Sequence, residues 1–212
     1  MIAGAATAAP ITYQYTATIG YAYGSTNYDG HTFAAGDTVK GTFSFDTAAP
    51  AKDGIDGEWL TFEDNAAYRQ KFTGTFSNGA SFDIGNAPWQ PSAPLSTTGI
   101  SNNDSFYGTD IFNMFAKNET YNVTMLLWDR SANLFNGTDL SQLLEYSAFT
   151  DEGNSDGREF AFGYKDPSDQ FGEVYGKITS LAVVPEPASA LLMLSGLGLL
   201  AAARRRKTSV GK

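Results

Sequence analysis

Two groups of carboxylates are the residues of this chain whose types and spacing could do chemistry. One lies within residues 53–64 and the other within residues 151–159. Acidic loops can bind Ca²⁺, which takes about six to eight oxygen ligands. Neither group has the alternating acids and central glycine of an EF-hand, so we expect solvated loops and no bound cofactor. A Ca²⁺ ion, if one binds, would take ligands from Asp53, Asp56, Glu58, Asp151 and Asp156.

The usual catalytic combinations are missing from the sequence. His31 is the single histidine, cysteine is absent, and no Gly-x-Ser-x-Gly or Gly-x-x-x-x-Gly-Lys motif occurs. A Ser-His-Asp triad, a Cys nucleophile and a phosphate-binding loop are therefore not expected. Paired acids could hydrolyse glycosides if they lay roughly 5–10 Å apart, but sequence does not fix that separation. The chain is predicted not to be an enzyme, and His31 to be a solvated turn residue.

Aromatic residues offer a second kind of chemistry, the stacking of sugar rings. Trp89 lies between Pro88 and Gln90-Pro91, in a stretch predicted to be a surface loop, where its ring could contact a carbohydrate. Trp59 and Trp128 are expected in the core. Trp89 is therefore the candidate carbohydrate contact.

The elements that would position these residues are predicted to be β-strands. Apolar and polar residues alternate from Ile11 to Tyr23 and again over residues 38–45, with the period of a half-buried strand. Leu140, Leu143 and Leu144 follow Asp139 at helical spacing and predict one short helix. Residues 51–66 and 85–110 are predicted to be irregular loops. Further strands are expected around residues 68–76, 82–84, 121–128, 160–164 and 174–183.

Seven or eight short strands with almost no helix indicate an all-β fold. We expect an antiparallel β-sandwich of jelly-roll type over residues 11–184. Five of the 14 Lys and Arg lie beyond residue 187, so residues 1–187 carry 23 acids and nine bases. Such an acidic domain is not suited to nucleic acid.

The C-terminal tail has the composition of a membrane segment. Residues 188–203 are apolar or small and carry no charge, and Arg204, Arg205, Arg206 and Lys207 follow directly. A helix of this length is about 24 Å long, slightly short for a hydrocarbon core of about 30 Å, but it can span if the bilayer thins and the arginines snorkel. Basic residues beside a membrane segment remain cytoplasmic. The tail thus predicts one transmembrane helix with the preceding domain outside the cytoplasm.

The motif Pro185-Glu186-Pro187, the apolar stretch and the arginine cluster together resemble the PEP-CTERM sorting signal of Gram-negative bacteria. The resemblance is confined to residues 185–212. It implies that Pro185, Glu186 and Pro187 are recognised by an exosortase, a membrane enzyme thought to cut near this motif. It also implies an inner-membrane precursor that is released to, or displayed on, the cell surface.

The first ten residues lack the basic and apolar regions of a complete signal peptide. Their Ala-x-Ala texture resembles the end of one, so we interpret residues 1–10 as a signal-peptide remnant or a disordered N-terminus. The expected function is that of an exported, non-enzymatic surface or extracellular-matrix protein. The alternative is a carbohydrate-binding module or carbohydrate-active enzyme with the same sorting tail.

Overall fold

The computed structural model describes residues 10–55, 58–62, 68, 70–85, 97–102, 108–131, 133–149, 157–166 and 168–185. Nearly all regular structure in these residues is β, and one 3-10 turn, η1 (Tyr146–Ala148), is present. The strands are β1 (Ile11–Gly24), β2 (Asn27–Tyr28), β3 (His31–Thr32), β4 (Thr38–Phe45), β5 (Ala51–Ile55), β6 (Trp59–Phe62), β7 (Lys71–Phe76), β8 (Ser81–Ile84), β9 (Thr97–Ser101), β10 (Asp110–Lys117), β11 (Tyr121–Asp129), β12 (Arg158–Lys165) and β13 (Phe171–Val183).

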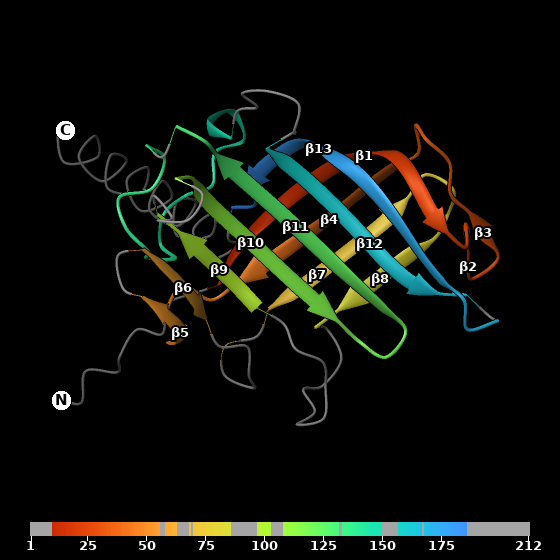
Figure 1. Ribbon diagram of the computed structural model, residues 1–212, viewed down its shortest axis with the longest axis horizontal. Helices are drawn as coiled ribbons and strands as arrows, with labels where there is room; N and C mark the ends of the chain where they lie inside the picture. The colour runs from red at the N-terminus through yellow and green to blue at the C-terminus, as the bar shows by residue number, and fades with distance from the viewer. Residues whose placement is uncertain are drawn as a thin grey trace, which may run out of the picture.

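Eleven strands form one antiparallel sheet in the order β5-β6-β9-β10-β11-β12-β13-β1-β4-β7-β8, and β2 pairs with β3. The sheet curls so that β10, β11 and β12 lie in front of β4, β7 and β8 (Figure 1). The all-β antiparallel prediction is confirmed. A sandwich of two separate sheets was expected, whereas here the long strands β13 and β1 join the two layers into one continuous sheet.

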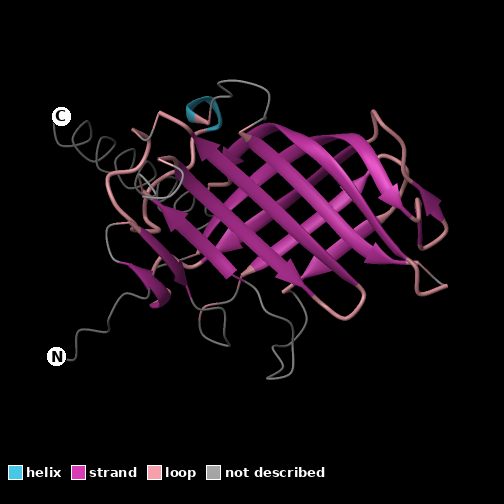
Figure 2. Cartoon of the chain, in the orientation of Figure 1, coloured by secondary structure: helices cyan, strands magenta, loops and turns pink. Residues whose placement is uncertain are grey.

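Bulges explain how β1 and β13 can belong to both layers. Their register shifts twice, between Thr16 and Ala17 and between Ile19 and Tyr21. Each extra residue bends its strand and increases the local twist, which lets a long strand follow a curled sheet. In Figure 2 the strands of the near and far layers run across one another as a result.

Aromatic side chains fill the space between the layers. Tyr15 of β1 stacks on Phe160 of β12 with ring centroids 5.8 Å apart. Phe82 of β8 stacks on Phe162, also in β12, with centroids 5.1 Å apart. These strands are not neighbours in the sheet, so the contacts hold the two layers together. An aromatic pair contributes about 0.5–1.5 kcal/mol beyond the area that it buries.

The alternation predicted for residues 11–23 holds only as far as the bulge. Tyr13, Tyr15 and Ile19 are buried, whereas Tyr21 is 59% and Tyr23 is 68% exposed. Gly20 is the unpaired residue between the register pairs Ile19–Gly176 and Tyr21–Tyr175. One extra residue moves all later side chains to the opposite face. The two tyrosines therefore lie on the outer surface.

Hydrogen bonds from Tyr121 tie the end of the sheet to the opposite layer. Its hydroxyl donates to the carbonyl oxygen of Asp83 at 2.9 Å and accepts from the Asp83 amide at 3.1 Å. Asp83 is in β8, the last strand of the order, while Tyr121 begins β11. One side chain thus satisfies two backbone groups at a sheet edge.

Two predictions of irregular and helical structure are wrong. Residues 51–66 and 85–110 contain β5, β6 and β9, and β9 pairs with both β6 and β10. Leu140 and Leu144 are buried, but residues 139–145 form turns and not a helix, because Asp139 accepts from the Ser141 amide and the Tyr13 hydroxyl accepts from the Leu144 amide.

Candidate functional site: the junction with the C-terminal tail

The last strand leads directly into the tail. β13 ends at Val183, which pairs with Tyr13, and the Val184 amide donates to the Thr12 carbonyl at 2.8 Å. Pro185 follows as an exposed residue. Because proline has no amide hydrogen, it cannot extend the ladder. The hydrogen bonding of the sheet therefore stops one residue before the Pro-Glu-Pro motif.

The strand that carries the tail is an inner strand of the sheet. β13 pairs with β12 along one side and with β1 along the other, and Ile178 and Leu181 bury their side chains in the core. The junction is thus attached to the central part of the fold. Glu186, Pro187, the predicted transmembrane helix 188–203 and the basic residues 204–207 lie outside the described residues.

The described residues contain no helix that is both long enough and apolar enough to cross a membrane.

The acidic candidates are not gathered into a metal site where the structure describes them. Asp53 lies exposed on β5, and its carboxylate accepts from the Gly54 amide at 2.9 Å. Glu58 is half-buried before β6, where its carbonyl accepts from the Asn102 amide at 2.7 Å. Asp56, Asp151 and Asp156 lie outside the described residues. Among the described His, Asp and Glu, no group of three or more could hold a metal ion.

Buried carboxylates do occur, but they hold loops. Asp110 accepts from the amides of Leu134 and Phe135 at 2.6 and 2.8 Å. Asp129 pairs with Asp110 across β10 and β11 and accepts from the Ser131 amide and hydroxyl. Both are almost fully buried. Sequence reasoning missed them because single acids within apolar strands give no motif.

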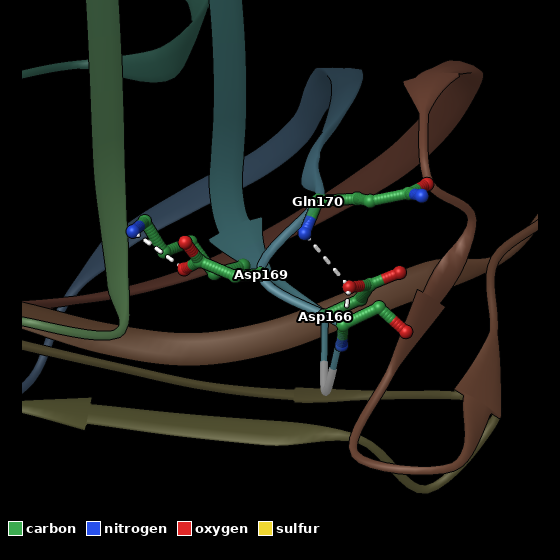
Figure 3. A network of polar contacts seen from close by, with 5 residues as sticks. Asp166, Asp169 and Gln170 are labelled. Carbon is green, nitrogen blue, oxygen red and sulfur yellow. Dashed lines mark hydrogen bonds and ion pairs between the residues drawn. The ribbon is translucent and has the colours of Figure 1, made fainter.

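The turn between β12 and β13 contains a second carboxylate network (Figure 3). Asp166 accepts from the amides of Gln170 and Ser168 and from the Ser25 hydroxyl. These hydrogen bonds, with the Gln170 amide contributing most, lower the pKa of the Asp166 carboxyl below its ordinary value. Asp169 is beside it and pairs with Lys165 at 2.6 Å. The network fixes a tight turn between the two strands.

The remaining candidates are placed as follows. Trp89 lies outside the described residues. Trp59 and Trp128 were expected in the core, but both are only half-buried. They belong to one row of paired residues that crosses the strands on the outer face. In this row Trp59 pairs with Ser101, Ser101 with Ile111, and Ile111 with Trp128. His31 is half-buried in β3 rather than free in solvent, and its Nδ1 contacts the Asn78 carbonyl oxygen at 2.8 Å.

An outward aromatic pair is the feature that sequence reasoning missed. The rings of Tyr21 and Tyr175 stack with centroids 4.9 Å apart and planes 18° from parallel. The Tyr175 hydroxyl donates to Glu173 at 2.5 Å, and this hydrogen bond is the main cause that raises the pKa of Tyr175 to about 12. Only the bulge at Gly20 reveals the pair, because regular alternation places Tyr21 inside.

A comparison with protein families identifies the tail. Residues 183–207 match the model of the PEP-CTERM protein-sorting motif, and the match begins at the last residue of β13. No curated protein and no solved structure matches the chain. The resemblance inferred from Pro185, Glu186, Pro187 and the basic cluster is thereby confirmed. A tail with this motif marks the chain for export, cell-surface targeting and processing by an exosortase.

Proposed function

We propose that this chain is a non-enzymatic protein of the bacterial cell surface or extracellular matrix. It is delivered as an inner-membrane precursor, held by a helix over residues 188–203, and an exosortase then cuts near Pro185-Glu186-Pro187. The β domain is its working part and requires no cofactor. The match of residues 183–207 to the sorting motif is the observation that carries this proposal.

The junction supports cleavage that leaves the fold intact. The last hydrogen bond to the sheet is made by the Val184 amide, and Pro185 is exposed. A cut at or beyond Pro185 removes no hydrogen bond of the ladder and no side chain of the described core. The β domain can therefore fold before processing and remain folded after it.

The described chemistry favours a binding or structural role over catalysis. Asp110, Asp129 and Asp166 are engaged by backbone amides that fix loops. A hydrolase of the two-carboxylate type needs its acids exposed to substrate about 5–10 Å apart. The commitment of these three carboxylates to loops and turns supports the binding or structural role over the alternative of a carbohydrate-active enzyme.

The test follows the mass of the mature protein in a Gram-negative host that encodes an exosortase. We expect the wild-type chain to lose Arg204–Lys207 in that host and to keep them when the exosortase gene is deleted. The double variant Pro185→Ala/Pro187→Ala should also keep them. Pro50→Ala, at an exposed proline outside the tail, is the matched control and should be processed normally. Identical processing with and without the exosortase would refute the proposal.

A further inference from the structure

An open pocket lies beside the exposed tyrosine pair on the outer face of β1 and β13. Its volume is about 530 Å³. Gly20 and Gly176 contribute backbone without side chains, and the rings of Tyr21 and Tyr175 stand beside them. The other lining residues are Thr18, Ile19, Glu159, Lys177 and Thr179.

The bulge creates this pocket in two ways. It turns Tyr21 outward, so that its ring meets Tyr175 of the neighbouring strand. It also places Gly20, which carries no side chain, where a regular strand would have a paired residue. On the partner strand, a Cβ at Gly176 would lie 2.6 Å from the Thr18 carbonyl oxygen, so that position admits only glycine without a backbone shift. The pocket therefore has two tyrosine rings on one side and, beside them, backbone that carries no side chains.

The polar groups of the pocket are electrically balanced. Glu159 and Lys177 are direct cross-strand partners, one acid opposite one base. Thr18 and Thr179 add hydroxyl groups. In a chain whose net charge is −9, the residues that line this pocket supply both hydrogen-bond donors and acceptors, with one acid and one base among them. A neutral polyhydroxylated ligand can hydrogen-bond to such groups in addition to the contacts that they already make, whereas an anionic or cationic ligand would meet one repulsive partner.

We propose that this pocket is a polysaccharide-binding site, in which the apolar face of a neutral pyranose ring packs on Tyr21 and its hydroxyl groups bond to Glu159 and Lys177. The inference deepens the proposed surface role, since it names the class of ligand that the β domain holds. It moves the carbohydrate contact from Trp89 to a face that the structure describes. Tyr23 and Phe171, which are 68% and 50% exposed on the same two strands, extend the aromatic surface beside it.

Two other occupants fit this face less well. Tyr175 lies eight residues before Val183, which is roughly 26 Å along the strand from the junction with the tail. A lipid surface would be at the tail end, and it would favour a basic patch rather than a balanced one. A second copy of the chain would need about 800 Å² of complementary surface on each partner. Here the aromatic rings are interrupted by charged residues.

The test measures retention of the purified full chain, in mild detergent, on cellulose, chitin and cross-linked dextran. We expect the wild type to bind at least one of these polysaccharides and Tyr21→Leu to bind roughly tenfold more weakly, since leucine is apolar but has no ring. Tyr21→Phe keeps the ring and should bind within about threefold of the wild type. Leu143→Ala, at another apolar residue that is 57% exposed, is the matched control and should bind normally.

Each unfavourable outcome has a definite meaning. The proposed binding site is wrong if wild type and Tyr21→Leu are retained equally. It is also wrong if the wild type is retained on none of the three polysaccharides. A Tyr21→Leu chain that is monomeric while the wild type self-associates, with polysaccharide retention unchanged, shows an interface between copies and also overturns it. Unchanged thermal unfolding of the variants confirms that the fold is retained. Because binding is measured on uncut chain, failure here is distinct from failure of exosortase processing.

Discussion

The carboxylate of Asp110 is predicted to hold residues 133–149 against the sheet. Its side chain is fully buried at the start of β10 and accepts from two backbone amides, of Leu134 and Phe135. In Asp110→Ala these amides lose a charged acceptor. Hydrogen bonds to charged groups contribute about 1.5–3 kcal/mol each, so the loss amounts to about 3–6 kcal/mol.

An opposing effect comes from Asp129, the buried acid that pairs with Asp110. Like charges at directly opposite strand positions destabilise by up to about 1 kcal/mol, and removing one of them relieves that repulsion. The hydrogen bonds exceed this relief, so we expect Asp110→Ala to lower the free energy of unfolding by about 2 kcal/mol or more. With an m-value of about 2 kcal/mol/M in urea, the midpoint should fall by about 1 M.

Urea unfolding of the purified chain, followed by tryptophan fluorescence, measures this shift. Asp110→Asn relieves the same repulsion but keeps one acceptor oxygen, so its midpoint should lie between wild type and Asp110→Ala. Asp169→Ala is the control, because its surface ion pair with Lys165 contributes at most about 1 kcal/mol. A midpoint of Asp110→Ala equal to or above that of the wild type would show that repulsion outweighs the anchoring hydrogen bonds, and our reasoning would be wrong.

Two further predictions concern the edge of the sheet and a turn. Tyr121→Phe removes both hydrogen bonds with the Asp83 backbone, so it should speed hydrogen exchange of the Asp83 amide and lower the free energy of unfolding by about 1–2 kcal/mol. Unchanged exchange would show that these hydrogen bonds do not hold the sheet edge. The lowered pKa of Asp166 means that its stabilising effect is present above the ordinary value of 3.8 and is lost as the pH falls through the lower folded-state pKa. On acidification in this range, the melting temperature of Asp166→Asn should therefore fall less than that of the wild type. If the two melting temperatures fall in parallel, the prediction is wrong.

Local patterns predicted most of the strands because each side chain reports its own environment. Tyr13 and Tyr15 alternate with polar residues and are buried as expected. The tail was identified equally directly, since recognition by a membrane enzyme depends on residue order and not on folding. Both kinds of prediction rest on neighbours in sequence.

The predictions that failed depend on partners distant in sequence. The leucines of residues 140–144 have helical spacing, but the amides of Leu134 and Leu144 bond to Asp110 and Tyr13, which hold the segment in turns. β9 has little apolar alternation and forms because strands pair with it on both sides. Strand pairing of this kind has no local signature.

The bulge at Gly20 shows how one residue changes both fold and surface. Without it, Tyr21 and Tyr23 would continue the buried row of Tyr13 and Tyr15, and β1 would have no extra residue to bend it between the layers. With it, the same strand holds the aromatic core at one end and presents an exposed aromatic pair at the other. The core end of β1 pairs with the end of β13 that leads into the sorting motif. The exposed pair therefore lies on the part of β1 and β13 that is away from the junction with the sorting motif.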